Sequence, residues 1–292
     1  MMIDYHIGSL CEASRRILSE GVPTVESSEP RPVFLDTRAW TKALLHSKES
    51  VSWDTRIFRF KLEHEEQSLG LPTAQHLMIR LKDPVTRESI IRSYTPISET
   101  NEKGFCDVLV KVYHDTEERA GGKMTKALDS IPTGHFIECK GPIGKFEYQG
   151  RGRCAINGKP KTVKRLFMIC GGSGITPIFQ VLRAVMQDKA DPTTCVVLDG
   201  NRLAEDILCK DDLDRFAREN TDRCNLLYTL TKGTEDWQGL RGRIGKELLE
   251  EHCQRNGDGE TLVLVCGPEA LEKAVHKALG DLGWRDDEVL FF

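Results

Sequence analysis

The hydrophobic pattern of this chain changes its period at about Arg165. Up to that point, short segments alternate apolar with charged residues, as Thr55–Leu62 does. Beyond it the apolar residues come in continuous runs, of which Leu166–Cys170 is the first. Alternation is typical of strands with one face in water, whereas continuous runs are typical of strands buried on both faces. The sequence therefore predicts two domains of different architecture in succession.

Short strands dominate the first of these domains, residues 38–150. Strands are predicted at Thr55–Leu62, His76–Lys82, Ile90–Thr95, Cys106–His114 and His135–Lys140, with one helix at Met124–Ser130. Several short strands separated by turn residues indicate a small antiparallel barrel.

Strands and helices alternate in the second domain, residues 166–292. Strands are predicted at Leu166–Cys170, Cys195–Leu198, Leu226–Leu230 and Leu262–Cys266, and helices from Ile178 onward, at Asp211–Glu219 and at Ile244–His252. This alternation indicates a parallel sheet covered by helices. The expected fold class is therefore β-barrel plus α/β, an antiparallel barrel followed by a parallel-sheet domain, with a connection over residues 151–165.

Residues 1–37 are expected to lie outside both domains. Three prolines with Ser and Glu in Val22–Pro32 predict a linker. The amphipathic segment Leu10–Leu18 is too short to fold alone.

Composition excludes several classes of function. The 292 residues are 39% hydrophobic and 29% charged with a formal net charge of −4, which gives no attraction to nucleic acid or an anionic membrane. No apolar run approaches the roughly 20 residues of a membrane helix, and the N-terminus lacks a secretory signal. The ten cysteines include no Cys-x-x-Cys pair, so neither a metal finger nor a disulfide framework is predicted. We expect a cytoplasmic protein without nucleic-acid partner, membrane contact or metal site.

A glycine-rich segment, Cys170–Pro177, joins the first apolar strand of the second domain to the helix after it. Glycine lets the backbone turn sharply and approach a ligand closely, and Thr176 and Pro177 fit as the N-cap and the first helical residue. Free N–H groups and the helix dipole at such a position favour a pyrophosphate. The segment is not a G-x-G-x-x-G fingerprint, and an ordinary strand–turn–helix joint could carry the same residues.

Weaker motifs lie elsewhere in the chain. In the barrel, Arg92–Ser98 offers a guanidinium, a tyrosine and hydroxyls, Lys111 lies in an alternating strand, and Gly121–Thr125 is a second glycine-to-helix joint. Cys266–Glu269 follows the last strongly apolar strand, where open α/β sheets bind ligands. Taken singly, these residues also fit an edge strand with a surface arginine and a buried structural cysteine.

The order of the motifs resembles a known family. A barrel with R-x-Y-T-x-x-S, then G-G-x-G-I-T-P, then C-G-P is similar to the ferredoxin-NADP⁺ reductase superfamily, and within it to cytochrome b5 reductases and the C-terminal module of fungal assimilatory nitrate reductases. The resemblance runs from about Arg38 to Phe292. Finer matches to the nitrate reductase module are Gly141–Tyr148, Met168–Gly172, Asn201–Arg202 and Asp206–Leu208, with Asp4–Gly8 similar to the end of its haem domain and Cys11–Arg31 to its hinge.

This resemblance implies FAD and NADPH as cofactors and suggests which residues bind them. FAD would be held by Arg92, Ser93, Tyr94, Thr95, Val110, Lys111, Val112, Tyr113, His114, Lys123, Met124, Thr125 and Thr176. NADPH would be held by Gly171, Gly172, Gly174, Arg202, Thr231, Lys232, Cys266, Gly267, Pro268 and Glu269. Cys266, Thr95 and Lys111 would lie at the point of hydride transfer, and Phe291–Phe292 would close near the flavin.

Thr231 underlies the expected choice of NADPH over NADH. NADH-using cytochrome b5 reductases carry aspartate where Thr231 falls, whereas Thr231–Lys232 is similar to the Ser-Arg pair of NADP⁺-using reductases. A carboxylate bonds a ribose 2′-hydroxyl and repels a 2′-phosphate, which a hydroxyl and a cation accept. Arg202 would add positive charge, although Asp199, at the end of an earlier strand, could serve a ribose hydroxyl instead.

The resemblance implies hydride transfer from NADPH to FAD, then single-electron transfer to a haem domain of the same polypeptide or another cytochrome b5-like acceptor. Haem, the molybdenum cofactor and nitrate reduction would belong to a longer parent enzyme, expected as a homodimer. Two alternatives stay open: a free-standing NADH-cytochrome b5 reductase, and a nucleotide-sensing module that keeps the fold without chemistry.

Overall fold

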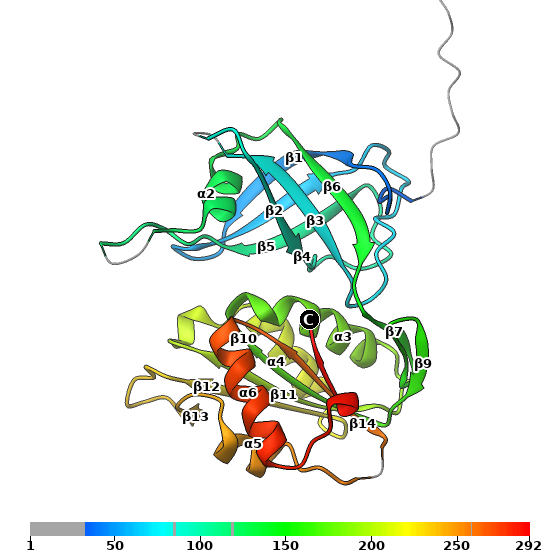
Figure 1. Cartoon of the computed structure of the whole chain (residues 1–292), viewed down its shortest axis with the longest axis vertical. Helices are drawn as coiled ribbons and strands as arrows, with labels where there is room; N and C mark the ends of the chain where they lie inside the picture. The colour runs from blue at the N-terminus through cyan, green and yellow to red at the C-terminus, as the bar shows by residue number, and fades with distance from the viewer. Residues whose placement is uncertain (1–32, 84–85, 118–119, 258) are drawn as a thin grey trace, which may run out of the picture. The chain divides into compact units, whose positions relative to one another are not determined.

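The computed structural model describes residues 33–83, 86–117, 120–257 and 259–292, which belong to one unit, Val33–Phe292 (Figure 1). The predicted linker at Val22–Pro32 and the match of Asp4–Gly8 to the end of a haem domain lie outside the described residues. Within the described part, the chain builds an antiparallel sheet first and a parallel sheet second. The two-part fold class predicted from the hydrophobic period is confirmed.

The first sheet has six antiparallel strands in the order β4-β3-β6-β1-β2-β5. They are β1 (Thr41–Ser50), β2 (Thr55–Lys61), β3 (His76–Lys82), β4 (Ser89–Tyr94), β5 (Phe105–Lys111) and β6 (Phe136–Ile143). The helix α2 (Lys123–Ser130) packs on β3 and β4. Alternate residues such as Phe58, Phe60, Leu77 and Ile79 are buried in one core, as period-two patterning requires.

Two parts of the barrel lack the alternation of apolar and polar residues that predicts a strand. β1 pairs with both β2 and β6, yet only Ala43 and Leu45 along it are buried. Phe34 and Leu35 bury their side chains in the barrel core, and their N–H groups bond the carbonyls of Ser68 and Leu69 at 3.0 and 3.2 Å. These residues therefore pack with the barrel although the strand pattern begins further along the chain.

The second sheet has six parallel strands in the order β13-β12-β11-β10-β14-β15. They are β10 (Arg165–Gly171), β11 (Thr194–Asn201), β12 (Cys224–Leu230), β13 (Leu240–Arg241), β14 (Thr261–Cys266) and β15 (Val289–Phe291). The helices are α3 (Ile175–Gln187), α4 (Lys210–Glu219), α5 (Lys246–His252) and α6 (Glu269–Asp281), with short 3₁₀ turns η1 (Gly172–Gly174), η2 (Ala204–Asp206) and η3 (Asp286–Glu288).

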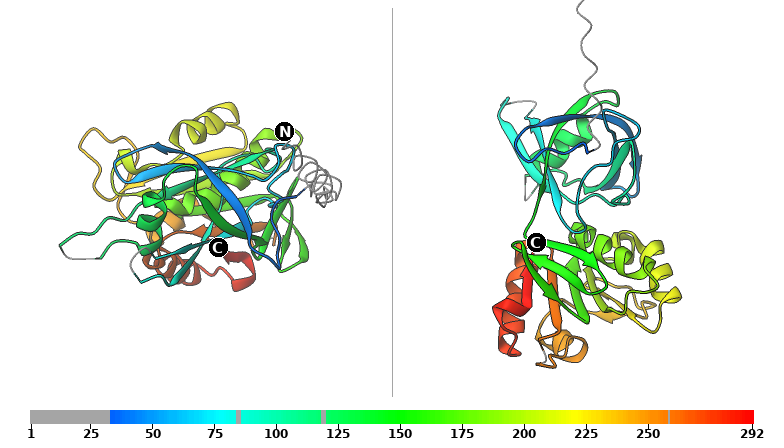
Figure 2. Two further views of the ribbon diagram at one scale, coloured as in Figure 1. Left: turned by 90° about the horizontal axis from the view of Figure 1, so that it is seen from above. Right: turned by 90° about the vertical axis from the view of Figure 1, so that its right-hand side faces the viewer.

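Different helices cover the two faces of this parallel sheet (Figure 2). Leu166, Met168 and Cys170 pack with α3 and α4, whereas Phe167 and Ile169 pack with α5 and α6. All five side chains are buried. A continuous apolar run is required here because every side chain of β10 meets a helix.

Strand order determines where a ligand site can form. β10 lies between β11 and β14, so the chain leaves β10 toward one side and later returns on the other. Open α/β sheets bind ligands at the carboxyl ends of strands at such a switch point. The segments that follow these strand ends are Gly171–Gly174 and Cys266–Pro268.

A small antiparallel sheet lies between the two large ones in sequence. It consists of β7 (Phe146–Gly150), β8 (Arg153–Ile156) and β9 (Lys159–Thr162). Two of these strands fall within residues 151–165, where the sequence suggested a simple connection.

One local prediction was wrong. Thr176 was expected as the N-cap of the helix after the glycine-rich segment, and Pro177 as its first residue, but α3 begins at Ile175 with Gly174 as its N-cap. The reason is η1, whose 3₁₀ turn runs directly into α3 and moves the helix start earlier. The Thr176 hydroxyl instead donates to the carbonyl of Ser173 at 3.2 Å.

None of the helices in the described part of the chain combines the length and the apolar character that a membrane span needs.

Candidate active site

Two backbone segments come very close together at the carboxyl ends of β10 and β14. The strands pair in register, with Cys170 opposite Cys266. A Cβ atom added to Gly174 would lie 2.2 Å from the carbonyl oxygen of Cys266 and 2.8 Å from the Cα atom of Gly267. Gly174 has an ordinary helical φ of −64°. Glycine is therefore required there by the close approach of backbone and not by a special conformation.

Space of the right kind for a phosphate group opens at the neighbouring glycine. Gly172 has a left-handed φ of +55°, and a Cβ added to it would meet no atom within 4 Å. Among the described residues, no side chain caps the N-terminus of α3. A helix N-terminus without a side-chain cap, next to open space, fits a pyrophosphate through its N–H groups and dipole.

Cys266 lies partly exposed beside this loop. Burial, followed by the charge of Glu272, raises the pKa of the Cys266 thiol to about 12. The thiol is therefore neutral at physiological pH, which suits a small contact surface and not a nucleophile. Gly267 donates its N–H to Glu272 at 3.2 Å, and Pro268 is the N-cap of α6.

Glu269, also predicted at the nucleotide site, is placed differently from its neighbours. It is the first residue of α6, and its exposed carboxylate pairs with Lys273 at 2.5 Å. A surface ion pair between residues one helical turn apart explains the position of the Glu269 side chain.

Lys111 joins the barrel to the α/β domain. Its Nζ atom lies 2.8 Å from Oδ1 of Asp206 in η2 and 3.1 Å from Oδ2 of Asp54. The Lys111 and Asp206 side chains are each 16% exposed, and that of Asp54 is 7% exposed. Burial lowers the pKa of Lys111, but bonds to Asp206 and then Asp54 raise it, and the net pKa is raised. Because β5 also contacts η1, this fixed ammonium lies where the barrel meets the glycine-rich loop.

The predicted flavin residues of β4 lie at the end of that strand. Arg92 and Ser93 are exposed, Tyr94 is partly buried and Thr95 is buried. Nη1 of Arg92 donates to the carbonyl of Ile91 at 2.7 Å. Burial raises the pKa of Tyr94, with smaller electrostatic effects from Arg92 and Tyr113, so the phenol stays protonated. This strand end thus presents an exposed cation and a partly buried aromatic ring.

The other predicted flavin residues form a second cluster at the N-terminus of α2. Tyr113 donates its N–H to Oγ1 of Thr125 at 3.2 Å, and its carbonyl accepts from Gly122 at 2.8 Å. A Cβ added to Gly121 would lie 2.4 Å from the Tyr113 carbonyl, so a side chain there would collide with the backbone. Lys123 is exposed, and no side chain of the described residues caps α2.

Several members of this cluster can reach a ligand only through the backbone. The side chains of Val110, Val112 and Met124 are buried in the barrel. His114 is exposed, and its ring stacks on that of Trp53 with 6.0 Å between centroids. The α2 N-terminus and the exposed guanidinium of β4 together fit the phosphate groups of a dinucleotide.

The residues predicted to select the 2′-phosphate come together in the fold. Thr231 donates its N–H to the carbonyl of Asn201 at 3.1 Å, and Lys232 donates its own to the carbonyl of Arg202 at 2.8 Å. The side chains of Arg202, Thr231 and Lys232 are all exposed. Two cations and a hydroxyl thus gather after the ends of β11 and β12.

Arg241 builds the loop that follows, and sequence reasoning missed it. Its guanidinium donates to four loop carbonyls, those of Gly233 at 3.0 Å, Thr234 at 2.7 Å, Glu235 at 3.2 Å and Trp237 at 3.0 Å. An exposed arginine in sequence gives no sign that its donors are committed to its own loop.

The suggestion that Asp199 serves a ribose hydroxyl was wrong. Its side chain is buried at 1% exposure within β11. Oδ1 accepts from Sγ of Cys170 at 3.5 Å, and Oδ2 accepts from Nδ2 of Asn201 at 2.9 Å. Burial raises the pKa of Asp199 to about 7. Both oxygens are therefore engaged inside the protein, and the carboxyl group faces no solvent.

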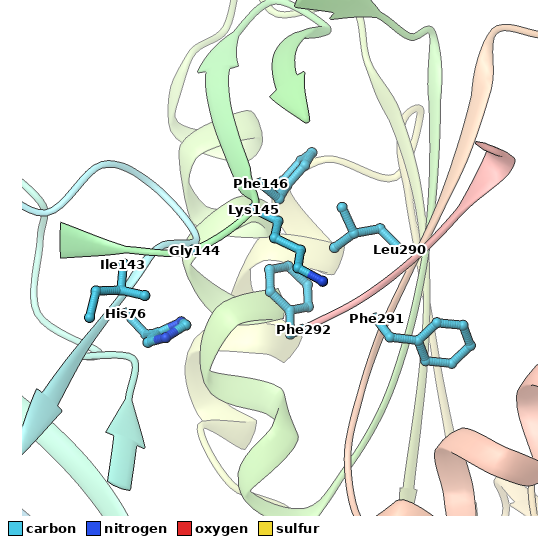
Figure 3. A pocket seen from close by; sticks show the side chains of 8 residues that line it. All are labelled: His76, Ile143, Gly144, Lys145, Phe146, Leu290, Phe291 and Phe292. Atoms are coloured by element: carbon cyan, nitrogen blue, oxygen red, sulfur yellow. The ribbon is translucent and has the colours of Figure 1, made fainter. Parts of the chain in front are cut away.

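The C-terminal aromatic residues line a pocket of about 350 Å³ (Figure 3). Its lining residues are His76, Ile143, Gly144, Lys145, Phe146, Leu290, Phe291 and Phe292. The rings of Phe146 and Phe292 meet edge to face at 6.0 Å. His76 begins β3, next to Leu77, whose partner on β4 is Tyr94. Burial lowers the pKa of His76, so the imidazole is neutral at pH 7. Sequence reasoning used His76 only as a strand boundary.

Comparison with known proteins agrees with this geometry. Residues 42–148 match a family described as the oxidoreductase FAD-binding domain, and residues 168–277 match the oxidoreductase NAD-binding domain. The chain is 64% identical over 295 residues to a nitrate reductase [NADPH] of Leptosphaeria maculans and 54% identical over 293 residues to that of Aspergillus niger. Each alignment covers 100% of this chain and 33% of the relative, so the chain spans about a third of the length of these proteins.

A solved structure is similar over its whole length. The crystal structure of the cytochrome b5 reductase domain of Ulva prolifera nitrate reductase is 35% identical in sequence, with a TM-score of 0.83. The alignment covers 89% of this chain and 99% of that domain.

Proposed function

We propose that this chain, which belongs to the family of cytochrome b5 reductase domains of nitrate reductases, binds FAD and NADPH. In this proposal it delivers electrons one at a time to a haem domain. A bound flavin supplies the chemistry, because it accepts a hydride from a nicotinamide and releases single electrons. What the chain itself must do is bind both nucleotides and hold them in register.

The observation that carries the proposal is the meeting of η1 with the end of β14. Gly174 lies so close to the backbone of Cys266 that no side chain fits between them, and the N-terminus of α3 has no side-chain cap among the described residues. The exposed flank of this junction offers N–H groups to a pyrophosphate, and the neutral thiol of Cys266 offers a small uncharged contact to a nicotinamide. Lys111 approaches the same junction from the barrel.

The flavin is assigned to the barrel. Arg92 and the N-terminus of α2, with Lys123 and Thr125, would hold its phosphate groups, while Tyr94 and Thr95 would contact its ring. Ser93, Thr176 and the segment 110–114 would complete this site, the last partly through its backbone. Phe291 and Phe292 would bound it from the α/β domain.

NADPH is proposed over NADH because of the charge near the end of β12. Thr231, Lys232 and Arg202 are exposed and adjacent, and together they offer a hydroxyl and two cations to a 2′-phosphate. The buried Asp199 does not oppose them, since its carboxyl group has no access to a ligand on the surface. Gly171, Gly172, Gly267, Pro268 and Glu269 would form the rest of the nucleotide site.

The parent context is part of the same proposal. The acceptor would be a haem domain of the same polypeptide or another cytochrome b5-like protein. Nitrate reduction, the haem and the molybdenum cofactor would belong to the remaining two thirds of a longer homodimeric enzyme in the cytoplasm.

Spectroscopy of the purified chain tests this function. Loaded with FAD, the protein should be yellow, should bleach anaerobically on addition of NADPH and should reduce ferricyanide, while nitrate reduction by this chain alone should be absent. A chain that binds nucleotide without bleaching would overturn the proposal in favour of a nucleotide-sensing module.

The cofactor choice has its own test in Thr231→Asp. The introduced carboxylate should repel the 2′-phosphate and shift the kcat/KM ratio from NADPH toward NADH by about tenfold or more, since charge-assisted bonds contribute about 1.5–3 kcal/mol. The control is Thr234→Asp, which places the same charge three residues further along the loop. An unchanged ratio in Thr231→Asp would contradict the assignment of the 2′-phosphate site.

A further inference from the structure

We propose that Gln180 and Arg183 of α3 are positioning residues that set the distance between the flavin and the nicotinamide. This inference rests on the proposed function and extends it. Both side chains leave the α/β domain and bond the barrel backbone, at the segment that directly follows the predicted flavin contacts Tyr94 and Thr95. The same helix begins at the glycine-rich loop assigned to NADPH.

Gln180 uses both ends of its amide across the domain boundary. Nε2 donates to the carbonyl of Pro96 at 2.8 Å, and Oε1 accepts from the N–H of Ala74 at 2.8 Å. The side chain is 2% exposed. A buried amide satisfied at both ends holds its partners in one geometry, because each group left unpaired costs about 1–3 kcal/mol.

Arg183 adds a second clamp one turn further along α3. Nη1 donates to the carbonyl of Ile97 at 2.6 Å and Nη2 to that of Ser98 at 2.5 Å. Nε lies 3.6 Å from the Glu99 carboxylate, and the Arg183 side chain is only 9% exposed. Burial lowers the pKa of Arg183, yet a guanidinium keeps its charge at any ordinary pH. The rigid fork matches two successive carbonyls, which a flexible ammonium does not.

The clamped segment is also tied to the strand that carries Lys111. Ile97 donates its N–H to the carbonyl of Asp107 at 2.8 Å, and Asp107 donates its own to Oγ of Ser98 at 3.1 Å. Movement of this segment would therefore displace β4 and β5 together.

The helix fixes the distance between these contacts and the nucleotide-binding end of α3. Gln180 and Arg183 lie five and eight residues after Ile175, which at about 1.5 Å per residue is roughly 8–12 Å from the nucleotide end of α3. Hydride transfer needs reacting atoms about 3–3.5 Å apart, and a misplacement of about 1 Å costs about 100-fold in rate. Contacts that fix the middle of α3 on the flavin segment are therefore placed to control the rate of hydride transfer more than the affinity for NADPH.

A matched arginine separates positioning from general stability. Arg223 also donates to backbone carbonyls at the far end of α3, among them Val185 at 3.1 Å and Met186 at 3.2 Å. Within the described residues, its hydrogen-bond partners all belong to the α/β domain. Loss of Arg223 should weaken the fold without moving the barrel.

The experiment compares Arg183→Lys, Gln180→Met and Arg223→Lys in the FAD-loaded chain. We expect the first two to lower the single-turnover rate of flavin bleaching at saturating NADPH by about tenfold or more. The KM for NADPH should change less than about threefold. The visible circular dichroism of the bound flavin should change in the first two variants and not in Arg223→Lys, while urea unfolding should show a loss of stability in all three.

Two results would overturn the inference: a wild-type bleaching rate in each of Gln180→Met and Arg183→Lys that folds, or an equal rate loss in Arg223→Lys. Gln180→Met keeps the side-chain volume, so the test stands even if Arg183→Lys fails to fold. If the wild-type chain itself does not bleach with NADPH, the proposed function has failed and not the positioning role alone.

Discussion

The buried carboxyl group of Asp199 should make the stability of this protein depend on pH in an unusual direction. In the fold its pKa is raised by burial from an ordinary value of 3.8 to about 7, and the Cys170 thiol and the Asn201 amide only partly offset this rise. The change that tests it is Asp199→Asn, which keeps the shape and can retain a bond to Asn201.

The sign follows from counting protons. Between the two pKa values the unfolded chain has lost the proton of Asp199, whereas the folded chain keeps it. Raising the pH in this window therefore favours unfolding by about 1.36 kcal/mol for each pH unit. From about pH 5 to about pH 7 the wild-type protein should lose about 3 kcal/mol from this one group, and above pH 7 the loss should level off because both states are then ionised.

Urea unfolding at a series of pH values measures the effect, with the FAD concentration held constant because bound ligand adds stability. The free energy of unfolding of Asp199→Asn should rise relative to wild type by about 3 kcal/mol between about pH 5 and pH 8. Asp188→Asn is the control of opposite sign, since the N–H of Ala190 and the guanidinium of Arg151 lower the pKa of Asp188. Because this pKa is lowered in the fold, the free energy of unfolding that Asp188 contributes to the wild-type protein is lost as the pH falls. Parallel curves for wild type and Asp199→Asn would refute the reasoning.

Two further predictions concern the junction of the domains. Gly174→Ala places a methyl group 2.2 Å from the Cys266 carbonyl and should cost about 1–3 kcal/mol and weaken NADPH binding. Gly172 has open space around it but a φ of +55°, so Gly172→Ala should lower the free energy of unfolding by about 1–2 kcal/mol. It should not displace β14 sterically. Equal NADPH affinities in the two variants, by fluorescence titration, would count against the close-approach argument. Lys111→Met leaves Asp54 and Asp206 without their cation and should lower the free energy of unfolding by about 3 kcal/mol. The double variant with Asp206→Asn should recover part of this loss, and no recovery would mean that the ion pair is not responsible.

Local patterns predicted the strands of both cores well. The alternation in Thr55–Leu62 and the apolar run Leu166–Cys170 correspond to β2 and β10 because burial on one or two faces is written directly into side-chain periodicity. β1 escaped prediction because its polar residues are held in the sheet by backbone bonds to β2 and β6, which leave no mark on side-chain choice.

The helix start shows a finer limit. Thr176 has the right chemistry for an N-cap and stands just before Pro177, but the 3₁₀ turn η1 already supplies the first helical turn. Cap preferences are local, whereas η1 includes Gly174, which passes against the backbone of Cys266, some ninety residues further along the chain.

The sequence by itself determined the two architectures, the glycine-rich loop at a strand end and the family resemblance, because each depends on residues close together in the chain. Only the tertiary structure decided that Lys111 pairs with Asp206, that Gln180 and Arg183 grip the barrel and that Asp199 is buried. These contacts join residues 84 to 95 positions apart or depend on a neighbouring strand. Such contacts form only when the whole chain packs, so no local pattern of residues can predict them.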